Sequence, residues 1–117
     1  MTPEDLHGLP SSAELIEATQ EWLTRELAPK LDGRDAFMVR VVNNVLGQVE
    51  REMATGAEQA AAVSHELETL GYADEAALAS AIRGRSVRID DPEVIAVVRA
   101  VVDARLAVAN PRYVERR

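Results

Sequence analysis

The sequence predicts an all-α protein, a compact bundle of about five helices that are mostly antiparallel. Apolar residues recur at three- and four-residue spacing through most of the chain, which is the period of an amphipathic helix. Helix-start signals precede these segments, and glycine or proline follows most of them. The connections between the segments are short, which favours antiparallel neighbours in a bundle.

Length and composition predict one small domain. With 117 residues, of which 47% are hydrophobic, the chain is long enough for a single core. We expect a tail over residues 1–10 and one helical domain over residues 11–117. The absence of cysteine excludes disulfides and thiolate metal sites. Residues 1–10 lack the apolar run of a signal peptide, and charged residues interrupt the longest apolar stretch, so a cytoplasmic protein without membrane contact is expected.

The first three helices are predicted from their caps and apolar stripes. Ser11 and Glu14 have capping-box spacing, so a helix should begin at residue 11 or 12 and end near residue 28, before Pro29. A second helix is expected over 34–54, capped by Gly56, and a third over 57–70. The second helix should pack centrally through a wide apolar face, made of Met38, Val41, Val42, Val45, Leu46, Val49 and Met53.

The last two helices follow a glycine turn and an irregular linker. Asp74 should cap a short helix that runs to residue 83. Asp91 and Pro92 are a strong start for a helix that reaches about residue 109. Its main stripe is expected to be Ile95, Val98, Val102, Leu106 and Ala109, widened by further valines. This surface exceeds what four partner helices cover, which predicts a homodimer interface on the last helix.

The charge distribution bears on possible partners. Residues 1–82 hold 15 acids and 5 bases (−10), whereas residues 83–117 hold 5 acids and 8 bases (+3), which sum to −7. An acidic body argues against nucleic-acid binding, which needs a basic footprint. The 57–83 region has the spacing of a helix-turn-helix, so a DNA-binding regulator stays the weakest alternative.

No motif for catalysis or for a cofactor is evident. The two histidines, His7 and His65, belong to no metal-binding pair at helical spacing, so no metal is expected. The sequence contains no nucleophile elbow, phosphate-binding glycine loop or dinucleotide fingerprint, and no cofactor is predicted. Enzyme activity is therefore left open, with a non-catalytic protein favoured.

Polar residues in unexpected places are the candidate binding residues. Arg40, Asn44 and Arg51 share one face of the second helix with Gly47, which costs up to about 1 kcal/mol there. This stripe is either an anion- or partner-binding surface or a solvated face. Arginines at 83, 85 and 88 offer a similar choice between a phosphate clamp and a solvated loop. Near the end of the chain, Arg112 is a further candidate, and so is Tyr113, whose ring should fold onto the bundle.

Several segments together resemble a known family. They are His7-Gly8-x-Pro10, Gly33-Arg34 leading to Phe37 and Arg40, Asn44-Val45-Leu46, Val49-x-Arg51-Glu52, and Asp90-Asp91-Pro92 opening a helix that closes on Asn110-Pro111-Arg112-Tyr113. The pattern is similar to an uncharacterised bacterial family of small helical proteins. The resemblance implies genes beside aminoglycoside-phosphotransferase-like kinases and acyl-CoA dehydrogenases, and it implies no catalytic residue.

The favoured function is a non-catalytic accessory protein that binds a kinase-like or acyl-CoA dehydrogenase-like enzyme. The alternative is a module, or a minor enzyme, that binds an acyl-CoA or a phosphorylated metabolite. Its motivation is the set of arginines on an otherwise acidic chain.

Overall fold

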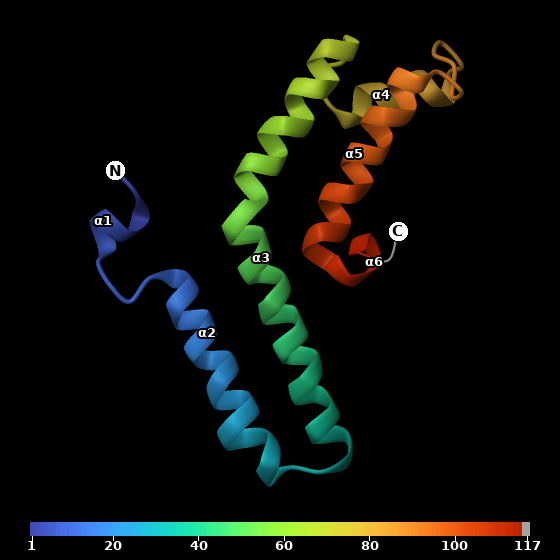
Figure 1. Ribbon diagram of the computed structural model, residues 1–117. Coiled ribbons are helices and arrows are strands. Elements are labelled where there is room, and N and C mark those ends of the chain that lie inside the picture. The colour runs from blue at the N-terminus through green and yellow to red at the C-terminus, as the bar shows by residue number, and fades with distance from the viewer. Residues whose placement is uncertain (116–117) are drawn as a thin grey trace. The chain divides into compact units, whose positions relative to one another are not determined.

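The computed structural model describes residues 1–115, and all regular structure in that range is helical (Figure 1). The predicted all-α class is therefore confirmed, whereas the single antiparallel bundle stays a prediction. Instead of about five helices, this range holds six α-helices, because short ones occur near both ends. They are α1 (Pro3–His7), α2 (Ser12–Trp22), α3 (Gly33–Leu70), α4 (Glu75–Arg83), α5 (Pro92–Ala109) and α6 (Pro111–Glu115).

The predicted helix starts are confirmed by their hydrogen bonds. Ser11 Oγ accepts from the Glu14 backbone N–H at 3.2 Å, and the Glu14 carboxylate accepts from the Ser11 N–H at 3.1 Å. Asp74 accepts from the backbone N–H of Ala77 at 2.8 Å at the start of α4. Asp91 accepts from the N–H of Glu93 at 2.9 Å at the start of α5. Each cap satisfies a donor that the first turn of a helix leaves without a partner.

The two helices predicted over 34–54 and 57–70 are one continuous helix, α3. The proposed break at Gly56 was wrong. A glycine inside a helix costs about 1 kcal/mol relative to alanine, and proline, the stronger breaker, is absent from this segment. The helix ends where predicted: Gly71 has a φ of 102°, and Tyr72 N–H donates to the Leu67 carbonyl at 2.9 Å.

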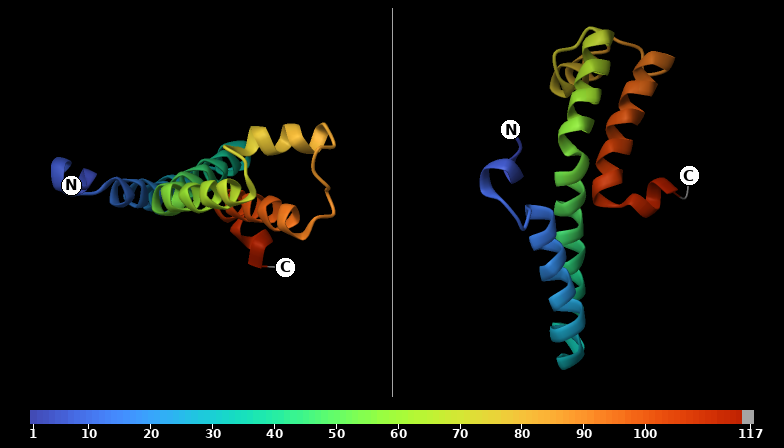
Figure 2. Two further views of the ribbon diagram at one scale, coloured as in Figure 1. Left: turned by 90° about the horizontal axis from the view of Figure 1, so that it is seen from above. Right: turned by 60° about the vertical axis from the view of Figure 1, so that its left-hand side comes forward.

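The chain divides into two compact units, and the first comprises Met1–Ala54. After α2 the chain continues through a π-helix, Leu23–Leu27, and a 3-10 turn, Ala28–Lys30, before reversing into α3. Within this unit α2 runs antiparallel to the first part of α3 and forms a helical hairpin with it (Figures 1 and 2). The Gln20 side chain donates to the Asn43 carbonyl at 3.3 Å, and the Asn43 amide donates to Thr24 Oγ1 at 2.8 Å. Two polar contacts thus join the helices of the hairpin.

The second unit, Thr55–Arg117, contains a buried apolar cluster. Its centre is formed by Leu67 from α3, Leu78 from α4, and Val94 and Val97 from α5, all 2–7% exposed. Half-buried side chains surround this centre, namely Val63, Leu70, Tyr72, Ile82 and Val87. Three helices therefore meet in one small core.

The structure shows which of the apolar faces of α5 and of α3 are buried. On α5 the buried residues are Val94 and Val97, whereas the predicted stripe of Ile95, Val98 and Val102 is 41–43% exposed. On α3 Val39 is buried, whereas most of the predicted stripe lies outside the hairpin contact: Met38, Val42, Val45, Val49 and Met53 are 40–54% exposed. Both helices have more than one apolar face, and the neighbouring helix selects only one of them.

Across residues 1–115, none of the helices combines the length and the apolar character needed to cross a bilayer.

Candidate binding surfaces

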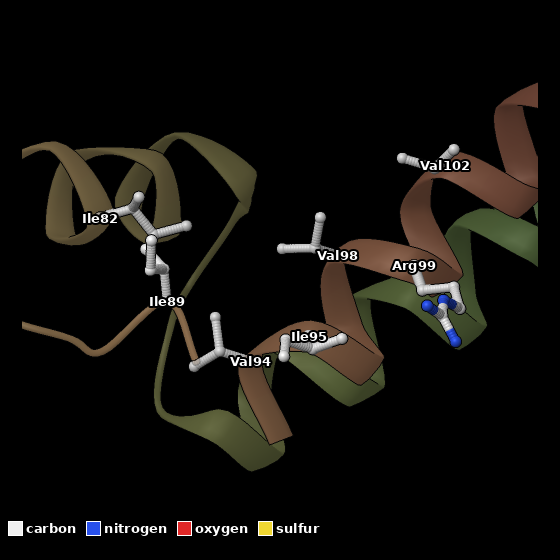
Figure 3. Close-up of a pocket in the computed structure, with 7 residues that line it drawn as sticks. All are labelled: Ile82, Ile89, Val94, Ile95, Val98, Arg99 and Val102. Atoms are coloured by element: carbon white, nitrogen blue, oxygen red, sulfur yellow. The ribbon is translucent and has the colours of Figure 1, made fainter. Parts of the chain in front are cut away.

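The second unit has an open apolar groove between α4 and α5. A hollow of about 390 Å³ is lined by Ile82, Ile89, Val94, Ile95, Val98, Arg99 and Val102 (Figure 3). A second hollow of about 380 Å³ adjoins it and shares Ile82, Val98 and Val102 with it. We call the two hollows together the α4–α5 groove.

Local structure explains how the groove forms. Val94 is 2% exposed and anchors the first turn of α5 in the core, so the next face of that helix, with Val98 and Val102, borders the groove. Ile82 comes from the last turn of α4 and faces Val94 and Val98 (Figure 3). Ile89 belongs to the loop between the two helices and is 71% exposed. The groove walls are therefore aliphatic and only partly covered.

Charged side chains lie at the ends of the groove. Arg105 Nη2 donates to both carboxylate oxygens of Glu75, at 2.9 Å each, and so links α5 to α4 beside the second hollow. Arg99 lies at the edge of the first hollow, and its guanidinium is turned away from Ile82 and Ile89 (Figure 3). Within residues 1–115 this guanidinium has no ion-pair partner. A ligand in the groove would therefore meet an aliphatic wall and one available cation.

The loop before α5 does not form the three-arginine clamp considered from the sequence. Arg88 Nε and Nη2 donate to the two carboxylate oxygens of Asp90 at 2.8 and 2.7 Å. This hydrogen-bonded pair lowers the pKa of Asp90 and raises the pKa of Arg88. Arg83 Nη2 donates to Ser80 Oγ at 3.4 Å. In this structure Arg88 and Arg83 thus make separate local contacts, with a carboxylate and with a serine hydroxyl.

The predicted polar stripe of the second helix lies on α3 in the first unit. Arg40 and Asn44 are exposed, and the guanidinium of Arg40 lies 5.9 Å from the centre of the Phe37 ring. Nη1 of Arg51 lies 3.2 Å from the position that a Cβ on Gly47 would occupy. The glycine therefore leaves room for the Arg51 side chain, which gives its presence in mid-helix a structural cause.

The other two candidates, Arg112 and Tyr113, lie on α6 in the second unit. Tyr113 is 55% exposed, so the expected folding of its ring onto the bundle was wrong. None of the five candidate residues lines either hollow of the groove. Their role in binding stays a prediction.

Side chains that bind metals do not cluster in the described part of the chain. Over residues 1–115 no three or more histidine, cysteine, aspartate or glutamate side chains are placed to hold one ion.

Part of the groove was identified from the sequence as the apolar stripe of the last helix, whose surplus surface was expected to be a homodimer interface. The stripe of Ile95, Val98 and Val102 is visible in the sequence from its three- and four-residue spacing. Ile89, by contrast, is an isolated aliphatic residue in a polar loop, and no periodic pattern identifies it. The signal that the sequence offered was its position between Arg88 and the pair Asp90-Asp91, because an isoleucine among charged residues of a loop is expected to lie at the surface.

Comparison with known proteins places the chain in a family. It belongs to the family described as Domain of unknown function (DUF6285), whose model matches residues 29–113. The match begins in the 3-10 turn after α2 and ends within α6. No curated protein and no solved structure matches the chain. The resemblance to an uncharacterised helical family is thus confirmed, and the gene neighbourhood that it implies stays a prediction.

Proposed function

We propose that this member of the DUF6285 family is a non-catalytic accessory protein that binds a partner enzyme through the α4–α5 groove. The observation that supports the proposal is the open aliphatic groove itself, with Arg99 available at its edge. Ile95, Val98 and Val102 are 42%, 41% and 43% exposed. An exposed apolar surface that is bordered by polar residues is typical of a protein-binding site.

The chemistry of the groove suggests what it would bind. Burial of apolar surface contributes roughly 25 cal/mol for each Å² removed from water, so a partner with an apolar face gains most along the valine stripe. An open aliphatic groove suits an amphipathic helix laid into it. Arg99 would favour a partner whose apolar face is flanked by a carboxylate, because a charge-assisted hydrogen bond fixes orientation.

The proposed partner is a kinase-like or acyl-CoA dehydrogenase-like enzyme. This choice rests on the gene neighbourhood that the family resemblance implies. On this proposal the protein acts in the cytoplasm, where both classes of enzyme would meet it.

The test is co-expression of the tagged chain with each of the two proposed enzymes, followed by size-exclusion chromatography with mass detection. We expect a stoichiometric complex with the unmodified chain. Val98→Glu should abolish that complex, because it places a charge on the apolar wall of the groove. Ala96→Glu adds the same charge at an exposed position of the same helix that does not line the groove, and it should leave the complex intact. No complex with either enzyme, or equal effects of both variants, would contradict the proposal.

A second candidate function is binding of an acyl-CoA or another anionic acyl compound. It is favoured by the combination of an aliphatic wall with Arg99. The probe is a titration with acyl-CoA esters of increasing chain length, followed by calorimetry. This candidate predicts that affinity rises with chain length and falls on Arg99→Gln. Binding that is independent of chain length would contradict it.

A further inference from the structure

The hairpin of the first unit has an apolar side that α2 and α3 do not cover themselves. Inward-facing residues include Ile16 of α2 and Leu23 at the start of the π-helix that follows it, and on α3 they include Val39 and Asn43. Exposed apolar residues stand one position before many of these inward residues in both helices. They are Leu15 and Trp22 on α2 and Met38, Val42, Val45, Val49 and Met53 on α3, all 40–55% exposed. We call these seven residues the hairpin face.

The exposed apolar residues of α2 and those of α3 lie on the same side of the hairpin. One position along a helix corresponds to a rotation of about 100° around its axis. Each exposed residue is therefore rotated by this angle, in the same sense about its own helix axis, from an inward-facing residue. Because the two helices are antiparallel, this rotation brings the exposed residues of α2 and those of α3 to the same side of the hairpin. The hairpin face is therefore a continuous two-helix surface rather than two separate stripes. From its geometry we infer that this face binds a second copy of the chain, so that two hairpins form an antiparallel four-helix bundle.

The spacing of the α3 residues supports a second copy rather than an unrelated partner. A two-fold symmetric contact requires that residue i meets residue j and that j meets i in return. If two α3 helices cross antiparallel with the axis beside Val45, then Met38 meets Met53 and Val42 meets Val49. The positions in each pair sum to 91, so one axis satisfies both pairs. The stripe is thus complementary to itself.

The charges on α3 favour the same antiparallel arrangement. Residues 33–43 hold two bases and one acid, for a net charge of +1, and residues 44–54 hold one base and two acids, for −1. An antiparallel pair places the positive half of one helix beside the negative half of the other. Although the whole chain carries −7, this segment is neutral and adds no net repulsion between copies.

The size of the hairpin face is adequate for a dimer. The largest apolar patch on an ordinary monomer covers roughly 300–600 Å². Seven large side chains at 40–55% exposure reach the upper part of that range before the flanking helix atoms are added. A stable interface buries roughly 800 Å² on each partner, so the proposed dimer would bury the hairpin face together with flanking atoms of both helices. The sequence predicted a homodimer interface on the last helix, whereas the inference places it on the hairpin.

The first test is the mass of the full chain in solution by sedimentation equilibrium. We expect twice the chain mass of 12.8 kDa. Val45→Glu places two like charges beside the symmetry axis and should raise the dissociation constant by about a hundred-fold or more. Gln48→Glu adds the same charge at an exposed position of α3 outside the hairpin face and should leave the dimer intact. Circular dichroism checks that both variants are folded, which is expected because Val45 is 54% exposed.

The second test fixes the direction of the pairing and uses the absence of native cysteine. Copies with Met38→Cys mixed with copies with Met53→Cys should form a disulfide between the two variants when the mixture is oxidised by dissolved oxygen. Neither variant alone should do so, because positions 38 and 53 are about 22 Å apart along a helix. A monomeric chain, a dimer that Val45→Glu leaves unchanged, or self-crosslinking of the Met38→Cys variant would overturn the inference. Because the hairpin face and the α4–α5 groove share no residue, a negative result here leaves the groove proposal standing.

Discussion

The two units of the chain differ in how they exclude water. The second unit buries Leu67, Leu78, Val94 and Val97 in a cluster to which three helices contribute. Across residues 1–54, in contrast, Val39 is the one buried apolar residue, at 8% exposure, and two side-chain hydrogen bonds join Asn43 of α3 to α2 and to the π-helix that follows it. A two-helix hairpin has no third layer to cover its outer apolar side.

This difference explains why the hairpin and the groove suggest different partners. The second unit already has a core, so its groove is a surface added to a stable structure. The first unit lacks such a core, and burial of its hairpin face against a second copy would supply one. Stability of the first unit should therefore depend on protein concentration, whereas that of the second should not.

The largest expected change in stability comes from a substitution in the core of the second unit. Leu67→Ala removes a side chain that is 2% exposed and should lower the free energy of unfolding of this unit by about 2–5 kcal/mol. Thermal denaturation followed by circular dichroism measures this loss. Trp22, the one tryptophan of the chain, reports on the first unit by fluorescence, and its transition should shift less.

A matched control lies in the same unit. Ile89→Ala shortens a side chain that is 71% exposed and should change stability by less than about 0.5 kcal/mol. If Leu67→Ala shifted both transitions equally, the two units would unfold as one, and the comparison between them would fail.

A smaller change in the free energy of unfolding, this time an increase, is expected from a substitution in the hairpin. Asn43 Oδ1 is buried and has no hydrogen-bond partner within the described residues, although its amide nitrogen donates to Thr24. Asn43→Leu removes this unsatisfied oxygen and should stabilise the hairpin by on the order of 1 kcal/mol, measured by Trp22 fluorescence during denaturation. The hydrogen bond from Gln20 goes to the backbone carbonyl and survives the change.

Asn44→Leu, at the exposed neighbouring position, should give no comparable gain. Destabilisation by Asn43→Leu would show that polar contacts, rather than apolar ones, hold α2 against α3.

Local signals in the sequence were sufficient for the helix ends. Ser11 with Glu14, Asp74, and Asp91 with Pro92 cap helices through bonds that span only two or three residues, so nearby sequence determines them. Gly56 was misjudged because a glycine ends a helix only when the chain also turns there. In α3 the hydrogen bonds continue through this position at a cost of about 1 kcal/mol.

The choice of buried face could not be predicted from the sequence alone. Val94 and Val98 are both valines on the same helix, yet the first is 2% and the second 41% exposed. Only the position of α4 and of the end of α3 distinguishes them, and that position depends on contacts between residues far apart in the chain. The other wall of the groove could not be predicted for the same reason, because Ile82 and Ile89 reach it from different segments.

The most direct test of the difference between the two units is amide hydrogen exchange of the full chain at two protein concentrations, one below and one above the dimer dissociation constant. We predict that amides of α2 and of residues 36–53 become more protected at the higher concentration. Amides around Leu67, Leu78 and Val97 should exchange at the same rate in both samples, because their core lies within one copy. Equal protection of the hairpin at both concentrations would contradict the account, since the first unit would then need no second copy.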